Sequence, residues 1–581
     1  MKSTFKMTVN FAVIVMLFFT ACDFFPEYPN PDFEWGIGDG ESAAILSYRG
    51  PGGAVVIPNQ IGGRLVRSIL HNAFSGSRMT SVIIPNTVTF IGDWAFSWNY
   101  LTSINIPASV TFIGDRVFLN NDNLYEITVA PANTHFMSVD GVLFNIDKTE
   151  LIQFPEGRID FYVIPKGVTT IGDFAFENSR LTSMTIGGTV TTIGDSAFRN
   201  SRLTSVTIGD TVITIGNSAF WGSHLTCVVI PNSVESIGIS AFSINQLTDV
   251  TIPGSVKTIG SGAFSNNQLT DVTIPDSVKT IGNSAFWGNQ LTDVTISNSV
   301  KTIGSGVFSN NQLTDVTIPN SVTSIESNAF QNNQLTSLTI PDSVISIRDG
   351  AFSRNRLTSV VIGSSVASIG DRVFAFNDTL HEITVSQDNT HFAAVDGVLF
   401  NKYKTRLIQF PVGRTNSYII PDSVALIGDA AFAVESLSSV NGLTSVTIPN
   451  SVALIGQQAF SRNKLTSLTI PNSVLSIGEE AFNQNQLTDL TIGNSVTSIG
   501  DLAFSNNYLS SVTIPNSVIS IGWNAFAGNP LTSIVIGANV NIHNNNSFGS
   551  GFDAAYRANG RRAGVYTRAD TNSTVWTWSQ N

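Results

Sequence analysis

The sequence is poor in the residues on which most enzyme chemistry depends. Its 581 residues include only two cysteines and six histidines, too few for a disulfide framework or a cysteine-rich metal site. Only 12% of the residues are charged and the net charge is −12, so the basic face that general nucleic-acid binding needs is missing. A Gly-x-Ser-x-Gly elbow, a phosphate-binding loop and a His-Glu-x-x-His pair are also absent. We therefore expect no enzyme activity, no metal, no cofactor and no nucleic-acid partner.

The chain is instead rich in apolar residues and in phenylalanine and glycine. Apolar residues make up 42% of it, with 38 phenylalanines and 47 glycines, a composition that excludes general disorder. A phenylalanine recurs every 22 residues from Phe198 to Phe374, and the same spacing returns from Phe460 to Phe526. A fixed period near 20 residues over most of a chain indicates a solenoid, in which each coil buries its neighbour's apolar side.

One coil can be followed from Leu247, which begins Leu-Thr-Asp-Val-Thr-Ile-Pro. The alternating β-branched residues predict a short strand, and the proline followed by a Gly-Ser, Asp-Ser or Asn-Ser pair predicts a turn. A second short extended piece precedes glycine, and an Ala-Phe pair then enters the interior from a helical or 3₁₀-like turn. Three residues later most coils carry asparagine, and some carry serine. We expect this buried amide to bond the backbone of adjacent coils.

The first thirty residues have the proportions of an export signal. Lys2 and Lys6 precede an apolar run over 9–19 that is too short to cross a bilayer. Phe19-Thr20-Ala21-Cys22 resembles the end of a bacterial lipoprotein signal, which implies removal of residues 1–21 and lipidation of Cys22. Ordinary secretion, with Cys22 as an unused thiol, is the alternative. The acidic, proline-containing stretch that follows predicts a tether over residues 22–40.

The repeat pattern is specific enough to resemble a known family. Its consensus, L-T-x-V-T-I-P-x-S-V-x-x-I-G-x-x-A-F-x-x-N, resembles the bacterial BspA-like, or treponemal-type, leucine-rich repeat of surface proteins, and the likeness covers roughly residues 45–540. It implies a β-rich solenoid with little helix, and a role in adhesion to host matrix or to other cells. We accordingly expect the solenoid to span residues 41–540.

Two inserts interrupt the period and resemble each other. They predict wider coils near 119–165 and 375–421, each with Asp-Gly before Val-Leu-Phe-Asn, which predicts a tight hairpin. After Phe526 the period fades, and residues 541–581 predict a small cap module in which Asn559-Gly560 would turn a hairpin. The alternative is that this aromatic and basic segment binds a ligand through Arg561, Arg562, Trp576 and Trp578.

The candidate binding face follows from residues that share a register. Aspartates stand 22 residues apart beside threonines, so they should form an exposed polar strip suited to many small contacts with a protein or glycan. Its candidate residues are Thr248, Asp249, Thr251, Thr270, Asp271, Thr273, Asp293 and Asp315. Bound cations would relieve the repulsion between the aspartates, whereas screening by salt is the simpler reading.

Taken together, these patterns predict an exported, acyl-anchored lipoprotein on the outer surface that binds an extracellular protein or glycan, such as host matrix. Asp23, next to the anchor, resembles an inner-membrane retention signal, so inner-membrane location stays open. The alternatives are a structural envelope protein without a dedicated ligand and a secreted carbohydrate-active enzyme.

Overall fold

The computed structural model describes residues 31–159, 161–414, 417–435, 442–543, 547–549 and 551–580. The chain forms two compact units, Met1–Asp147 with Pro155–Arg158, and Lys148–Phe154 with Ile159–Asn581. The predicted signal peptide and Cys22 lie outside the described residues. Within the described ranges, no helix is both long and apolar enough to cross a membrane.

The first unit begins with an antiparallel strand pair and continues as parallel coils. Strand β1 (Phe33–Ile37) pairs with β2 (Ala43–Tyr48) across a 3₁₀ turn, and β2 leads into a parallel ladder. The ring of Phe33 packs 5.1 Å from that of Tyr48, between ring centroids. Residues 33–40, which the sequence assigned to the predicted tether, belong to the fold, because Phe33 is buried and starts β1. The other elements of this unit are η2 (Asp39–Glu41), β3 (Gly53–Val56), β4 (Gln60–Ile61), β5 (Arg64–Ile69), β6 (Met79–Ile83), β7 (Phe90–Ile91), β8 (Ser103–Ile106), β9 (Phe112–Ile113), β10 (Glu126–Val129), β11 (Phe136–Val139) and β12 (Val142–Asn145).

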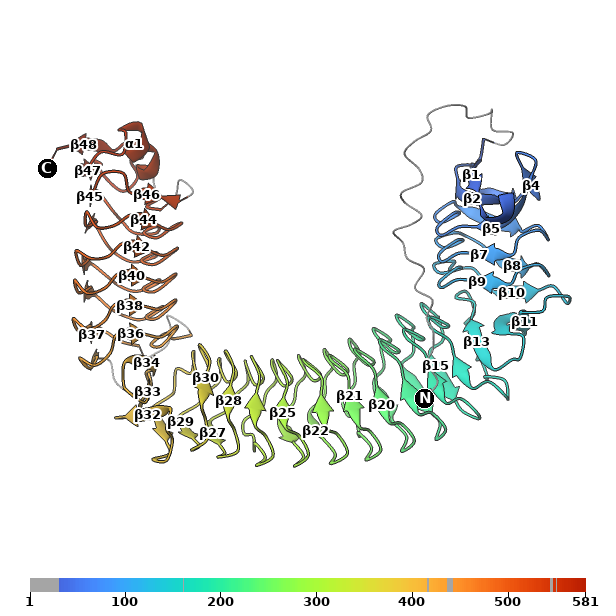
Figure 1. The fold of residues 1–581 in the computed structure, drawn as a ribbon, viewed down its shortest axis with the longest axis horizontal. Helices are drawn as coiled ribbons and strands as arrows, with labels where there is room; N and C mark the ends of the chain where they lie inside the picture. The colour runs from blue at the N-terminus through green and yellow to red at the C-terminus, as the bar shows by residue number, and fades with distance from the viewer. Residues whose placement is uncertain are drawn as a thin grey trace. The chain divides into compact units, whose positions relative to one another are not determined.

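The second unit stacks short parallel strands in two sets, one coil on the next (Figure 1). One set contains the second extended piece of each coil. These strands are β13 (Glu150–Gln153), β14 (Thr170–Ile171), β16 (Thr192–Ile193), β18 (Thr214–Ile215), β20 (Ser236–Ile237), β21 (Thr258–Ile259), β23 (Thr280–Ile281), β25 (Thr302–Ile303), β26 (Ser324–Ile325), β28 (Ser346–Ile347), β30 (Ser368–Ile369), β34 (Arg406–Gln409), β36 (Leu426–Ile427), β38 (Leu454–Ile455), β40 (Ser476–Ile477), β42 (Ser498–Ile499), β44 (Ser520–Ile521) and β46 (Asn541–Ile542).

The other set contains the alternating segment that begins each repeat, where the β-branched residues were expected to form a strand. Its strands are β15 (Ser183–Ile186), β17 (Ser205–Ile208), β19 (Cys227–Val229), β22 (Asp271–Thr273), β24 (Asp293–Thr295), β27 (Ser337–Ile340), β29 (Ser359–Ile362), β31 (Glu382–Val385), β35 (Ser417–Ile419), β37 (Ser445–Thr447), β39 (Ser467–Thr469), β41 (Asp489–Thr491), β43 (Ser511–Thr513) and β45 (Ser533–Ile536). The β-rich, leucine-rich-repeat solenoid predicted from the sequence is confirmed.

Phenylalanine fills the interior of the coils. Phe198 and Phe220 stack with their ring centroids 5.0 Å apart and their planes within 2°, and the arrangement repeats through the second unit. Both side chains are inaccessible to solvent or nearly so. Because each ring is covered by the rings of its two neighbours, no single coil could bury its apolar residues alone.

The asparagine three residues after each phenylalanine joins adjacent coils, as predicted. Nδ2 of Asn267 donates to the carbonyl oxygens of Phe264 in its own coil and Phe242 in the preceding coil, at 3.1 and 2.9 Å. Its Oδ1 accepts from the backbone N–H of Leu247 at 3.1 Å. Serine supplies part of this bonding in other coils, since Ser223 Oγ donates to the carbonyl of Phe198 at 2.7 Å. One buried amide thus satisfies three backbone groups that stacking removes from water.

Each 22-residue coil turns at two left-handed backbone positions, two residues before and two residues after its phenylalanine. In the coil of Phe264 these positions are Gly262 and Asn266, with φ of 63° and 53°. A left-handed conformation costs an ordinary residue roughly 1–2 kcal/mol, and least for glycine and asparagine. These positive φ angles also confine the Ala-Phe segment to successive turns and prevent a continuous helix.

The two inserts contain the predicted hairpins. In the first unit β11 and β12 are antiparallel, and Asp140 and Gly141 between them have φ of 50° and 75°, which fits a type I′ turn. In the second unit β32 (Phe392–Val395) and β33 (Val398–Asn401) repeat the arrangement, and β33 also pairs antiparallel with β34 before the parallel ladder resumes.

The C-terminal end covers the last coil. Strand β47 (Gly564–Thr567) pairs antiparallel with β45 and with β48 (Thr577–Ser579), so the edge of β45 is not left open. The hairpin predicted at Asn559-Gly560 is wrong, because helix α1 (Phe552–Ala558) precedes these residues and Asn559 ends it. Packing of the Phe552 ring against Tyr566 favours the helix over the extended form.

Candidate functional site

The eight threonines and aspartates predicted to form a binding face are all exposed. We call them the Thr-Asp strip: Thr248, Asp249, Thr251, Thr270, Asp271, Thr273, Asp293 and Asp315. Asp271 and Asp293 face each other in register across the parallel pair β22–β24. Asp249 and Asp315 occupy the same coil position but lie outside assigned strands.

The strip is polar and contains one hollow. Asp293 and Asp315 line this hollow of about 330 Å³ together with Thr295 and Thr317. Thr270 Oγ1 donates to Oδ2 of Asp271 at 3.1 Å, so threonine already satisfies part of the carboxylate. Among the described residues, no three side chains of His, Cys, Asp or Glu are grouped closely enough to hold a metal ion. The arrangement can offer rows of hydrogen-bonding groups to a large ligand.

The four C-terminal candidates do not share one role. Arg561, Arg562 and Trp578 are exposed. The ring of Trp576, by contrast, packs edge-on against Phe552 at 5.4 Å and lies 5.0 Å from the Arg568 guanidinium carbon. Trp576 therefore stabilises the cap, while the other three leave a small basic and aromatic surface.

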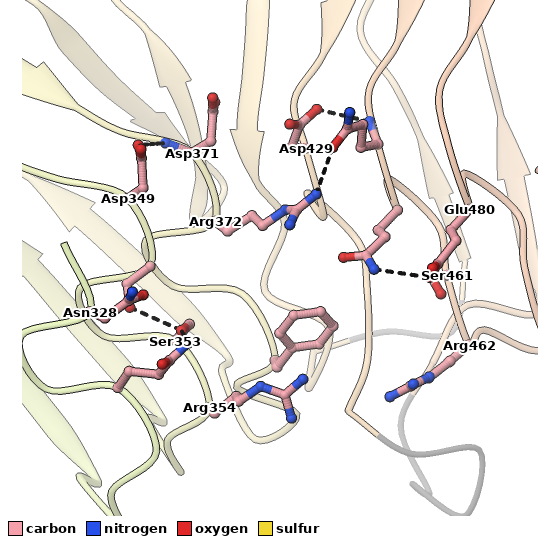
Figure 2. A pocket seen from close by; sticks show the side chains of 15 residues that line it. Asn328, Asp349, Ser353, Arg354, Asp371, Arg372, Asp429, Ser461, Arg462 and Glu480 are labelled. Atoms are coloured by element: carbon pink, nitrogen blue, oxygen red, sulfur yellow. Dashed lines mark hydrogen bonds between the residues drawn. The ribbon is translucent and has the colours of Figure 1, made fainter. Parts of the chain in front are cut away.

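A pocket larger than the strip's hollow, which the sequence did not predict, lies in the second unit (Figure 2). Its walls come from the coils before and after the second wide coil, and its volume is about 490 Å³, within the usual range for small-ligand sites. The lining residues are Asn328, Gln331, Asp349, Gly350, Ser353, Arg354, Asp371, Arg372, Phe376, Asp429, Gln457, Gln458, Ser461, Arg462 and Glu480.

Backbone amides orient the carboxylates of this pocket. Oδ1 of Asp349 accepts from the N–H of Asp371 at 2.9 Å, and Oδ1 of Asp429 accepts from the N–H of Gln457 at 2.8 Å. Arg372 extends across the pocket and donates from Nη2 to Oε1 of Gln457 at 3.0 Å (Figure 2). This last bond joins the two walls.

A second contact between the walls involves Glu435 at the pocket's side. Its carboxylate pairs with Arg354, and its carbonyl accepts from Nη1 of Arg462 at 2.7 Å. Burial raises the pKa of Glu435 above its ordinary value, although the two guanidinium groups act in the opposite direction. The guanidinium carbon of Arg354 lies 5.0 Å from the centre of the Phe376 ring.

A departure from the repeat was the available sequence signal for this pocket. Arg354, Arg372, Phe376, Arg462 and Glu480 all occupy left-handed positions, where other coils commonly carry glycine, asparagine or serine. Bulky side chains also occupy left-handed positions away from the pocket, as Trp94 and Leu502 do, so the pocket differs only in having several of them together.

Stacked 22-residue coils with parallel strands and columns of phenylalanine and asparagine define a leucine-rich-repeat β-solenoid. The model of the BspA type leucine rich repeat region, which holds six copies of the repeat, matches residues 55–162, 169–292, 279–396 and 435–551. The chain belongs to this family, as its repeat predicted. No curated protein matches the chain significantly.

The chain also matches solved structures of bacterial leucine-rich-repeat proteins. A leucine-rich repeat protein from Eubacterium ventriosum is 22% identical over 49% of this chain and 83% of its own, with a TM-score of 0.36. A leucine rich cell surface protein from Faecalibacterium prausnitzii is 20% identical over 89% of this chain and 90% of its own, with a TM-score of 0.27. The pneumococcal vaccine antigen PcpA is 18% identical over 88% and 81%, with a TM-score of 0.28.

Proposed function

We propose that this protein is an exported cell-envelope lipoprotein whose solenoid binds an extracellular protein or glycan through the Thr-Asp strip, in adhesion to host matrix or to other cells. The observation that carries the proposal is the exposed, in-register pairing of Asp271 with Asp293, flanked by exposed threonines. Family membership supports binding in general, since repeat arrays present long surfaces that make many contacts.

Charge reversal on the strip tests this function. The full chain, purified in mild detergent, should bind saturably to at least one member of a panel of immobilised matrix proteins and glycans. Asp271→Lys with Asp293→Lys should weaken that binding at least tenfold. Asp489→Lys is the matched control, because Asp489 is exposed at the same strand position in a distant coil.

Two results would favour the alternatives. Lack of saturable binding across the panel would favour a structural envelope protein without a dedicated ligand. Turnover of a polysaccharide, lost on replacing one carboxylate, would establish a carbohydrate-active enzyme in place of the non-catalytic role proposed here.

The membrane anchor has a separate test. Labelled palmitate should enter the protein, and Cys22→Ser should abolish the labelling. Equal labelling of both forms would refute acylation at Cys22. Protease treatment of intact cells should then degrade the solenoid if it lies on the outer surface, whereas protection would indicate retention inside the envelope, as Asp23 allows.

A further inference from the structure

We propose that the pocket between the coils before and after the second wide coil binds a neutral carbohydrate, one or two sugar residues of a glycan. This site is separate from the Thr-Asp strip, and neither depends on the other. The proposal rests on the two-sided construction of the pocket, its hydrogen-bonding groups, its charge balance and its single aromatic ring.

The two walls are held together by side chains rather than by the coil ladder. The Arg372–Gln457 hydrogen bond and the Arg354–Glu435 ion pair each join residues more than 80 positions apart. A ligand between these walls would be enclosed from two sides, which a single strand face does not achieve. Figure 2 shows Arg372 reaching from one wall toward Asp429 on the other.

Both donors and acceptors line the pocket, and one buried donor has no partner among the described residues. Nε of Arg372 is buried and has no partner among the described residues. A buried donor without a partner carries a desolvation cost that a ligand oxygen would remove. Asp349 and Asp429 each use Oδ1 for a backbone N–H, which fixes the carboxylate and directs Oδ2 elsewhere. Vicinal hydroxyl groups, which both donate and accept, match such a mixture.

The charges in the pocket nearly cancel. Its lining carries three guanidinium groups, on Arg354, Arg372 and Arg462, against four carboxylates, on Asp349, Asp371, Asp429 and Glu480. A phosphate or sulfate ligand would be repelled by the carboxylates, and a free cation by the arginines. Strong binding of an apolar molecule would leave many polar groups unsatisfied. A neutral polyhydroxylated ligand avoids all three costs.

Phe376 adds the apolar contact that a sugar ring needs. The ring lines the pocket and is half-buried, with the Arg354 guanidinium over it. A pyranose presents C–H groups on one face and hydroxyls at its rim. The aromatic ring can contact the C–H face, while the neighbouring carboxylates, amides and guanidinium groups bond the hydroxyls. Holding Phe376 in a left-handed conformation, with φ of 61°, opposes its backbone preference.

Calorimetry on the full chain in mild detergent tests the assignment. The probes are neutral oligosaccharides of glucose, mannose, galactose, xylose and N-acetylglucosamine, with oligogalacturonate, heparin fragments and inorganic phosphate as charged comparisons. We expect saturable binding of at least one neutral oligosaccharide and none of the charged probes. Arg372→Ala and Asp429→Asn should each weaken it at least tenfold. Asp429→Asn keeps an acceptor for the Gln457 N–H and should therefore fold. It remains a valid test of sugar binding if Arg372→Ala fails to fold.

Controls separate this site from the strip. Arg348→Ala changes an exposed arginine of the same region, outside the pocket, and should leave sugar binding unchanged, as should Asp271→Lys with Asp293→Lys. The proposal would be overturned by the absence of saturable sugar binding, by binding that survives both pocket variants, or by preference for a charged probe. Sugar binding lost only in the strip variant would also overturn it. If the strip variant loses matrix binding but keeps sugar binding, the result bears on the proposed adhesion and leaves the sugar site unaffected.

Discussion

The coils that contain Phe242, Phe264, Phe286 and Phe308 can be compared with the coils that form the pocket. We call the first group the regular coils. Their interiors are equivalent to those of the pocket coils, since Phe352 stacks 5.3 Å from Phe330 much as Phe264 stacks 5.4 Å from Phe242. The asparagine bonds are also the same in both groups.

The two groups differ at the left-handed positions. The regular coils carry mainly serine, glycine and asparagine there. The pocket coils keep Asn328 and Gly350 at two of these positions but carry Arg354, Arg372, Phe376, Arg462 and Glu480 at others. The difference shows how a repeat protein can acquire a specific site. The stacked interior tolerates little change, but the turn positions project outward and accept new side chains for a modest backbone cost.

Removing an interior ring tests whether the interiors are energetically equivalent. Phe286→Ala should lower the free energy of unfolding by about 3–5 kcal/mol, because a fully buried ring would leave a cavity between its neighbours. Phe352→Ala in a pocket coil should cost the same. Denaturant unfolding with hydrogen exchange of the affected coils measures both, and Thr295→Ala on the surface is the control. Unequal costs would show that the interiors are not equivalent.

The comparison extends to the cap, where one carboxylate is buried whereas those of the Thr-Asp strip are exposed. Burial raises the pKa of Asp553 from 3.8 to about 6, although the Ser547 N–H and Arg557 oppose the shift. The folded state therefore binds a proton more tightly than the unfolded state. The raised pKa contributes about 3 kcal/mol at most to the free energy of unfolding. This contribution is fully present below pH 3.8 and is lost as the pH rises through 6.

Asp553→Asn should remove this pH dependence and stabilise the cap at pH 7. The amide oxygen can still accept from the Ser547 N–H, a 2.6 Å bond in the unaltered protein. Thermal unfolding between pH 4 and 8 measures the effect. An unchanged pH profile in the variant would contradict the raised pKa.

Replacing an asparagine of the interior column should cost less than removing a ring. Asn289→Ala leaves the buried N–H of Leu269 without a partner and should cost about 2 kcal/mol. The Phe264 and Phe286 carbonyls each lose one bond but keep another, from Asn267 and Asn311. Asn289→Ser should cost less, because Ser223 bonds the Phe198 carbonyl in a natural coil. Equal losses for alanine and serine would mean that packing, rather than hydrogen bonding, selects this position.

Exchanging residues at the left-handed positions tests the backbone cost directly. Gly262→Ala should destabilise the protein by about 1 kcal/mol, because φ is 63° and the new Cβ would lie 3.2 Å from Ser240 Oγ. Glu480→Gly should stabilise the pocket coils by a comparable or smaller amount, since it also loses the 2.9 Å bond from Gln458. Denaturant midpoints compare the two. Destabilisation by Glu480→Gly would show that the side-chain contact outweighs the backbone cost.

The smallest effect concerns the paired carboxylates of the strip. Asp271→Asn should raise stability by less than about 0.5 kcal/mol at low salt, because it removes repulsion from the exposed Asp293. The gain should vanish in high salt, because salt then screens the repulsion between the two aspartates in the unaltered protein. Melting temperatures of both forms across a salt series check this, and a salt-independent gain would exclude a purely electrostatic cause.

Predictions that depended on neighbouring or regularly repeated residues were correct, whereas a prediction that depended on irregular contacts between distant residues was wrong. The Asp140-Gly141 hairpin depends on two adjacent residues and was predicted correctly. The asparagine bonds were also predicted, because a period of 22 places equivalent residues side by side. The hairpin at Asn559-Gly560 was wrong, since α1 depends on contacts of Phe552 and Tyr556 with Tyr566, which no local pattern reveals.

By itself, the sequence determined the family, the coil length, the interior columns of phenylalanine and asparagine and the exposure of the Thr-Asp strip. All of these repeat, and repetition converts sequence spacing into spatial contact. Only the tertiary structure decided the pocket, because Arg372 and Gln457 are 85 residues apart and meet across a wide coil. The low charge content has the same origin, since most positions of each coil are occupied by apolar packing and short polar turns.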